Sequence, residues 1–203
     1  MRVTLDECLA WVLGRDGAVK AALAAALAQN GAHVACRALD ETARGEARSP
    51  PDIALVVHDL AADGAAPDRA ALIAVSERLG VLMQERGGRL ILVTTPFGLL
   101  PARRHVAQSL ASAETVAAMR GLAMRLGPRV LVNAVGAGAI TDGQGGFLSG
   151  SAAMLDHVPS GAPGTLVDVV HAVLFLADPM NPYMTGHLLT VDGGWSAGYG
   201  RNF

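Results

Sequence analysis

Lysine and tyrosine, two residue types that serve in acid–base catalysis, are scarce in this 203-residue chain. There is one lysine, Lys20, and there are two tyrosines, Tyr183 and Tyr199. The two cysteines, Cys8 and Cys36, match no zinc spacing, and no histidines cluster with cysteine or carboxylate side chains at metal-site spacing. The sequence therefore predicts neither a metal centre nor a disulfide framework.

A glycine-bearing turn near the N-terminus joins the first predicted strand to the first predicted helix. A short apolar run ends at Gly14, Asp16 and Gly17 follow, and a helix-forming stretch comes next. Such a turn between strand and helix presents backbone N–H groups to a phosphate. Lys20 lies on the first helical turn, where it could bind that phosphate, but we favour a solvated lysine. The negative charge of Asp16 argues against phosphate binding.

Short apolar runs alternate with helix-forming stretches along the chain. The predicted strands are 11–14, 33–36, 53–57, 90–93, 130–132 and 188–191. The predicted helices are one that ends at residue 29, then 69–86, 105–126 and 166–177. This alternation predicts a doubly wound α/β fold, with a parallel sheet covered on both faces, in a single domain over 1–203. Residues 136–164 hold eight glycines and little periodicity, so we predict a long loop there.

The composition excludes several classes of protein. Hydrophobic residues make up 51% of the chain and charged residues 17%, which provides a core and excludes disorder. The apolar runs are far shorter than the ~18 residues of a membrane span. A net charge of -2 gives no case for nucleic acid. Without a basic stretch at the N-terminus we read no secretory signal, and we expect a cytoplasmic protein.

Three segments in family order resemble the short-chain dehydrogenases/reductases. Residues 88–98 resemble the family's "G-x-I-V-N-I-S-S-x-x-G", 132–138 its "VNAVAPG" with Ala137 in place of proline, and 183–195 its "TG-x-x-x-x-x-DGG-W" end. The similarity runs from about residue 51 to the end and is weaker before. It implies a Rossmann-like sheet and NAD-dependent alcohol or carbonyl chemistry.

The resemblance also implies that the catalytic centre is lost. The family serine falls on Thr95, the tyrosine on Gln108 and the lysine on Ser112. The family's helical asparagine has no counterpart, since no asparagine occurs between Asn30 and Asn133. In the family, a phenol acidified by the ammonium protonates the developing alkoxide, which an amide cannot do at neutral pH. Losing such help costs ~10²–10⁴-fold in rate, so we expect no catalytic residues in this chain.

The family's cofactor turn is altered as well. Gly14 remains, the middle glycine falls on Ala18, or on Gly17 with a one-residue slip, and the third falls on Lys20. The family glycines let the backbone approach the pyrophosphate. We therefore expect that this chain binds no cofactor and that Gly14, Gly17 and Lys20 are remnants. Only residues 37–51 separate the second predicted strand from the next, so the third family strand and its flanking helices are expected to be missing.

The segments that the family uses for assembly are retained. In the family, the counterparts of helices 69–86 and 105–126 build the main dimer interface, and those of helix 166–177 and the last strand build the second interface of the tetramer. The tail 195–203 resembles tails that cross an interface. We therefore expect a non-catalytic structural or regulatory subunit in a heterotetramer with an intact catalytic family member that holds NAD. The arrangement resembles the two-subunit dehydrogenase for 2-[hydroxy(phenyl)methyl]succinyl-CoA of anaerobic toluene degradation, which has one inactive subunit.

Two alternatives stay open. A divergent NAD(P)H-dependent carbonyl reductase acting alone would use Thr95 with water or His105 as the proton source, and Arg37 would favour a 2′-phosphate. A homo-oligomeric small-molecule sensor would use the cleft beneath the 141–163 loop. For residues 58–59, at the position of the family's cofactor turn, we favour a capping role over catalysis.

Overall fold

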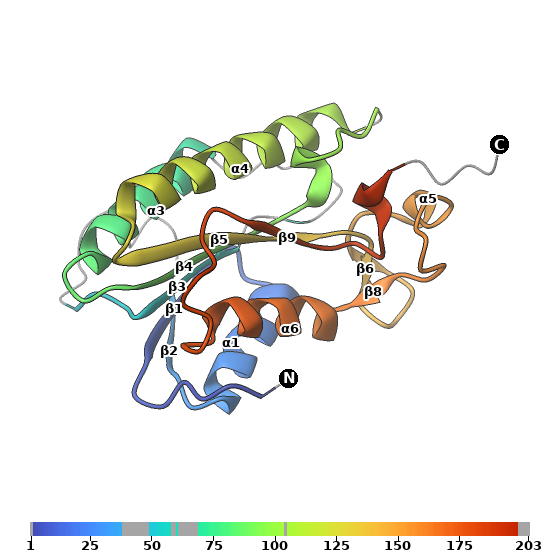
Figure 1. Ribbon diagram of the computed structural model, residues 1–203. Coiled ribbons are helices and arrows are strands. Elements are labelled where there is room, and N and C mark those ends of the chain that lie inside the picture. Colours follow the sequence, from blue (N-terminus) through green and yellow to red (C-terminus); the bar gives the residue numbers. More distant parts are fainter. Residues whose placement is uncertain (1, 38–48, 58–59, 61–68, 104, 199–203) are drawn as a thin grey trace.

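A six-stranded parallel sheet forms the centre of the molecule (Figure 1). The computed structural model describes residues 2–37, 49–57, 60, 69–103 and 105–198. The strands are β1 (Leu9–Gly14), β2 (His33–Arg37), β3 (Ile53–Val57), β4 (Gly88–Thr94), β5 (Val130–Ala137) and β9 (Leu188–Val191). Their order in the sheet is β2-β1-β3-β4-β5-β9. This confirms the predicted doubly wound α/β fold.

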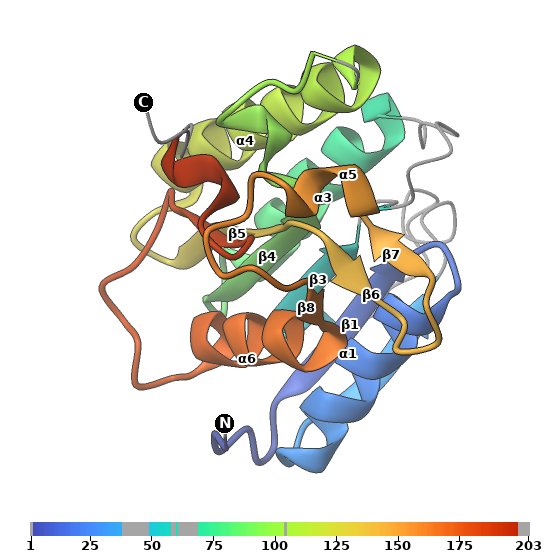
Figure 2. The ribbon, with the colours of Figure 1, turned by 90° about the vertical axis from the view of Figure 1, so that its right-hand side faces the viewer.

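In the described part of the chain, two helices pack on each face of the sheet, and Figures 1 and 2 show their arrangement. Helices α1 (Ala18–Gln29) and α6 (Leu166–Ala177) lie on one face, and α3 (Arg69–Met83) and α4 (Val106–Leu126) lie on the other. Because successive side chains of a strand alternate between faces, Val12 of β1 packs in the α1–α6 core and Trp11 in the α3–α4 core. Burial on both faces explains the nearly continuous apolar runs in the sequence.

The region predicted to be one long loop contains short regular elements. Strand β6 (Ile140–Thr141) pairs antiparallel with β7 (Phe147–Ser149) and parallel with β8 (Gly164–Thr165), and the short helix α5 (Ala152–Leu155) follows β7. Figure 2 shows these elements grouped at one end of the main sheet. They are too short to give a periodic signal, so the prediction of one long loop over 136–164 missed them.

The observed ends of other helices and strands differ from the predicted ends by a few residues. Helix α3 ends at Met83 rather than at residue 86, and β5 extends to Ala137 rather than to residue 132. Strand β2 is the end strand of the sheet as far as the structure describes it. The expected loss of a strand concerns 37–51, and of these residues 38–48 lie outside the described residues. The proposed capping role of 58–59 also falls outside them.

The N-terminus of α6 supplies a pH-dependent contribution to stability. Asp168 Oδ2 accepts hydrogen bonds from the backbone N–H of Thr165 at 2.7 Å and from its hydroxyl at 2.9 Å. These bonds lower the pKa of Asp168 in the folded state. A lowered folded pKa means that the contribution is fully present above the unfolded pKa of about 3.9 and is lost as the pH falls through the folded pKa.

We therefore expect Asp168→Ala to lower the free energy of unfolding by about 1 kcal/mol at pH 7, as is usual for a lost helix cap. The difference from the wild type should shrink as the carboxyl is protonated below about pH 4. Urea unfolding at pH 7 and at pH 3 measures both values. A difference that stays constant with pH would contradict the role of the ionised carboxylate.

Candidate functional site

Thr95 and Ser112, which the sequence resemblance aligns with the family's serine and lysine, lie in contact where the end of β4 meets helix α4. Thr95 follows β4, and its hydroxyl is 2.5 Å from the hydroxyl of Ser112 on α4. The Thr94 hydroxyl is 3.3 Å from the same Ser112 oxygen. All three side chains are buried. The chain therefore has a cluster of three neutral hydroxyls, and none of these groups can donate or accept a full proton near neutral pH.

Close packing fixes this hydroxyl cluster. The short 3-10 helix η1 (Pro96–Gly98) follows Thr95 and runs directly against α4. A Cβ on Gly98 would lie 2.7 Å from the backbone C and O atoms of Ser112, so only glycine permits the contact. Gln108, at the family's tyrosine position, is half-buried one turn before Ser112. The structure thus brings Thr95 and Ser112 into contact, and Gln108, which the resemblance aligns with the family's phenol, lies on the same helix.

We expect Ser112→Ala to destabilise the fold by about 1–2 kcal/mol, because two buried threonine hydroxyls lose a hydrogen-bond partner. Thermal or urea unfolding checks the value. If the hydroxyl has no catalytic role, the variant leaves the activity of an oligomer containing this chain unchanged once it is folded. A selective loss of activity at unchanged stability would contradict this.

Lys20 is not solvated, contrary to the sequence-based expectation. The residue is only 5% exposed. Its ammonium donates to the backbone oxygen of Gly14 at 3.0 Å, to Asp16 Oδ1 at 3.0 Å and to the backbone oxygen of Arg37 at 3.1 Å. An ammonium has three N–H donors, and these acceptors use all of them. Lys20 therefore ties the carboxyl end of β1 to that of β2, where the family turn binds its nucleotide, and offers no remaining donor to a phosphate.

The two glycines of the turn have different surroundings. Gly14 has φ +128° and a Cβ there would lie 2.3 Å from the carbonyl oxygen of Val57 on the neighbouring strand β3. Gly17 has an extended φ of 167°, and a Cβ added to it would meet nothing within 4 Å. Packing against β3 thus explains why Gly14 is glycine, without any phosphate. Arg37, the candidate for a 2′-phosphate, places its guanidinium 4.4 Å from the centre of the Trp11 ring.

A cavity of about 610 Å³ lies between η1, the start of α4 and helix α5. Phe97 stacks on His105 with ring centroids 5.5 Å apart and meets Trp195 edge to face at 5.2 Å. Asp192 holds the Trp195 segment by accepting hydrogen bonds from the N–H groups of Gly194 and Ser196, at 3.0 Å each. The cavity lies where the sensor alternative expects its ligand. Sequence reasoning missed Phe97, which the rarity of aromatic residues (4%) could have indicated.

The described part of the chain gives two negative findings. It contains no group of three or more His, Cys, Asp or Glu side chains placed to hold a metal ion. No helix in it is long and apolar enough to cross a bilayer.

Comparison with known proteins identifies the family. Residues 68–196, well over half of the chain, match the family model described as "Enoyl-(Acyl carrier protein) reductase". This chain belongs to the short-chain dehydrogenases/reductases. The sequence-based assignment to this family of oxidoreductases is thereby confirmed.

Individual relatives within the short-chain dehydrogenase/reductase family agree. A peroxisomal 2,4-dienoyl-CoA reductase of Mus musculus is 33% identical over 55% of this chain and 40% of its own length. A 3-oxoacyl-[acyl-carrier-protein] reductase of Vibrio harveyi is 33% identical over 56% of this chain and 48% of its own length. The chain thus spans less than half the length of these curated relatives.

A solved structure shows the same fold. A crystal structure described as a short-chain alcohol dehydrogenase from Sinorhizobium meliloti 1021 superposes with a TM-score of 0.76 at 18% identity, covering 96% of this chain and 98% of that one. At this identity the likeness shows the fold alone.

Proposed function

We propose that this chain is a non-catalytic subunit of the short-chain dehydrogenase/reductase family, and that it assembles with an intact catalytic member that holds NAD. The proposal depends mainly on the hydrogen bonds of Lys20. Its ammonium donates to Asp16 and to the carbonyl groups of Gly14 and Arg37, so no N–H donor remains for a nucleotide at this turn. The hydroxyl cluster of Thr94, Thr95 and Ser112 adds support because it lacks a proton donor for an alkoxide.

Exposed apolar side chains support the assembly role. Large side chains on the outer surfaces of α3 and α4 are strongly exposed, among them Val81 (58%) and Met124 (82%). A second group lies on α6 and on the connection to β9, including Met180 (86%) and Tyr183 (101%). These two surfaces correspond to the two interfaces that the family resemblance implies. Association would remove this apolar area from water.

Strand β9 adds to the second surface. It is the end strand of the sheet in the described part of the chain, beside β5, and its outer edge offers backbone N–H and C=O groups for pairing. Asn133 fixes the segment before β9 by donating to the backbone oxygen of Met184 at 2.7 Å and accepting from the N–H of His187 at 3.1 Å. The segment that carries Tyr183 is thereby held in a defined place.

The names of the relatives suggest a class of substrate for the catalytic partner. The reductases of Mus musculus and Vibrio harveyi are named for acyl groups carried by coenzyme A and by acyl carrier protein. We therefore propose an acyl-thioester substrate, of which a 3-hydroxyacyl-CoA such as 2-[hydroxy(phenyl)methyl]succinyl-CoA is one candidate. This chain would contribute its assembly surfaces and no reacting group.

Co-expression with catalytically intact short-chain dehydrogenases/reductases of the same organism tests the proposal. We expect a stable complex that contains both chains, with NAD bound and turned over by the partner, and we expect native mass spectrometry to give its stoichiometry. Tyr183→Asp should weaken the complex, whereas Gln144→Asp, on the exposed β6–β7 turn, should leave it intact. A chain that forms only a self-contained oligomer and never binds such a partner would overturn the proposal.

A further inference from the structure

Two methionine side chains are almost fully exposed in the described part of the chain. Met124 is 82% exposed and Met180 is 86% exposed. A two-electron oxidant reacts with a thioether only where it can reach the sulfur. The structure therefore leaves these two methionines open to oxidation. The other methionines that it describes are shielded, three by full burial and one by partial burial against the α1–α6 core, and they are Met83, Met119, Met154 and Met184.

A hydrogen-bonded turn holds Met180 at the surface. The backbone N–H of Asn181 donates to the carbonyl oxygen of Asp178 at 3.0 Å, and the N–H of Met180 donates to Asp178 Oδ1 at 2.9 Å. The side-chain amide of Asn181 donates to the backbone oxygen of Phe175, near the end of α6, at 3.3 Å. These bonds fix the backbone on both sides of Met180, so its exposed thioether belongs to an ordered segment.

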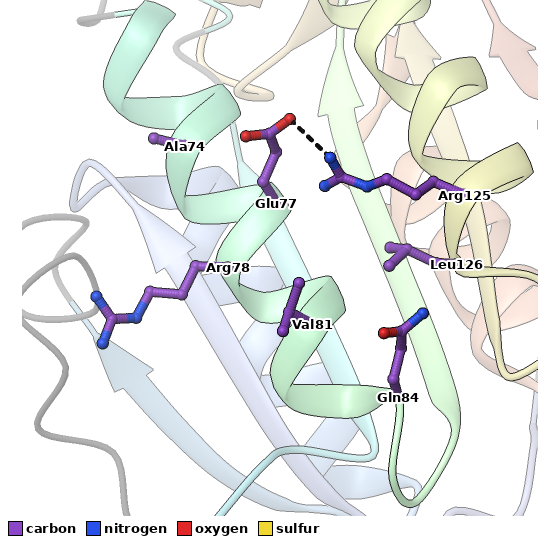
Figure 3. Close-up of a pocket in the computed structure, with 7 residues that line it drawn as sticks. All are labelled: Ala74, Glu77, Arg78, Val81, Gln84, Arg125 and Leu126. Carbon is purple, nitrogen blue, oxygen red and sulfur yellow. Dashed lines mark hydrogen bonds and ion pairs between the residues drawn. The ribbon is translucent and has the colours of Figure 1, made fainter.

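The end of α4 that carries Met124 is also held in place. Arg125 forms an ion pair with Glu77 of α3 at 3.4 Å, and Leu126 is buried in the α3–α4 core. Figure 3 shows Arg125 and Leu126 at the groove between α3 and α4, with the ion pair drawn as a dashed line. Met124 is thus exposed on a helix end whose next two residues are fixed by contacts with the rest of the fold.

The two exposed methionines lie on different assembly surfaces. Met124 lies with Val81 on the surface of α3 and α4, and Met180 lies with Tyr183 on the surface of α6 and the connection to β9. A methionine side chain is unbranched and polarizable, so it adapts to an irregular apolar contact. Its sulfoxide is polar, and burying that oxygen without a hydrogen-bond donor is unfavourable. Oxidation of either residue would therefore weaken the association that its surface makes.

We propose that Met124 and Met180 are modification sites through which hydrogen peroxide controls assembly. In the free chain both side chains are oxidised to methionine sulfoxide, and the oxidised chain binds the catalytic chain more weakly. In the assembled oligomer the contacts at the two surfaces cover the sulfurs and protect them. The inference rests on the proposed function and adds a means of regulating it.

The oxidation step needs only the thioether and hydrogen peroxide. A sulfur lone pair attacks one peroxide oxygen, a sulfur–oxygen bond forms, and the oxygen–oxygen bond breaks. The proton of the transferred hydroxyl group passes to the departing hydroxide, which gives water. Sulfur loses two electrons and the peroxide gains them. Methionine sulfoxide reductases reverse the step, because two thiols are oxidised to a disulfide and the sulfoxide oxygen leaves as water.

Peptide mass spectrometry of the isolated full-length chain tests the two sites. Under limiting hydrogen peroxide, Met124 and Met180 should be oxidised at least about tenfold faster than the buried Met83 and Met119. The rates are measured below the melting temperature, so that the buried sulfurs stay covered. Equal rates at all four methionines would overturn the inference.

Binding of the oxidised chain to the catalytic chain tests the control of assembly. In both experiments this chain carries Cys8→Ser and Cys36→Ser, so that oxidation of sulfur is confined to methionine, and peroxide is removed before mixing. Oxidation should raise the dissociation constant at least about tenfold, and a methionine sulfoxide reductase should restore the untreated value. An unchanged affinity after complete oxidation of Met124 and Met180 would contradict the proposed control.

Leucine at both positions provides the matched control. The Met124→Leu, Met180→Leu variant retains apolar side chains of similar volume but has no sulfur at either site. Peroxide should leave the affinity of this variant at its own untreated value. An equal loss of affinity in the variant and in the parent chain would show that other methionines cause the effect, and the inference would be wrong.

The two proposals can fail in distinguishable ways. If the catalytic chain binds equally well before and after oxidation, the regulation is wrong and the subunit role stands. If no catalytic family member binds even the untreated chain, the subunit role is wrong and the regulation fails with it. The binding of the untreated chain separates the two results.

Discussion

Replacing Lys20 with methionine is expected to lower the free energy of unfolding by about 2–4 kcal/mol, or the melting temperature by about 5–15 °C. Methionine retains the buried stem but donates no hydrogen bond. The carbonyl oxygen of Gly14 is buried, so it loses its bond to the ammonium without gaining water, and Arg37 loses a second bond. Two carbonyl oxygens without a hydrogen bond lower the stability of the fold. This loss of free energy is larger than the gain from no longer burying the charge of the ammonium. Thermal and urea unfolding measure the change.

Asp16→Asn is the matched control for Lys20→Met. The side chain of Asp16 is 97% exposed, so its ion pair with Lys20 is largely screened by solvent. We expect a change within about 1 kcal/mol. Equal effects of the two substitutions would show that the ion pair, rather than the bonds to the strand ends, stabilises the turn. A methionine variant as stable as the wild type would contradict a structural role for Lys20.

Gly14→Ala is expected to lower the free energy of unfolding by about 3 kcal/mol or more, the largest effect of any glycine-to-alanine substitution in the turn. The added Cβ would lie 2.3 Å from the carbonyl oxygen of Val57, and φ is +128°. Both the strand contact and the backbone conformation must change to accommodate it. Low soluble yield and a strongly reduced melting temperature are the expected observations.

Gly17→Ala, three residues along the same turn, is the control for Gly14→Ala. It meets no atom within 4 Å and its φ of 167° suits any residue. The expected change is below about 1 kcal/mol, the usual difference between glycine and alanine at a helix N-cap. If Gly14→Ala were as stable as Gly17→Ala, packing on β3 would not explain why residue 14 is glycine. A role of Gly14 in ligand binding would then be the better explanation.

The sequence predicted the elements with strong local patterns. Helix α6 (Leu166–Ala177) and strand β9 (Leu188–Val191) have the predicted bounds, because a polar segment or a proline follows each apolar pattern. Strands β6, β7 and β8 were missed since two or three residues carry no periodicity. Strands β6 and β7 pair across a short turn, whereas β8 pairs with β6 beyond β7 and α5, a contact that the local sequence does not show.

The candidate site was predictable only in the part where the sequence carries family motifs. Family motifs identified Thr95 and Ser112, and the contact between them follows from the packing of α4 on the end of β4. The burial of Lys20 was not predictable from its position on a first helical turn. It depends on the converging ends of β1 and β2, whose carbonyl groups provide acceptors that only the folded chain brings together.

Calorimetric titration of the isolated full-length chain with NADH and with NADPH tests the central claim most directly. Because the ammonium of Lys20 is saturated by the chain's own acceptors at the nucleotide turn, only heat of dilution is expected for either cofactor at about millimolar concentration. A saturable heat with a defined stoichiometry would show that this chain holds its own dinucleotide. That result would contradict the account of a subunit without a cofactor.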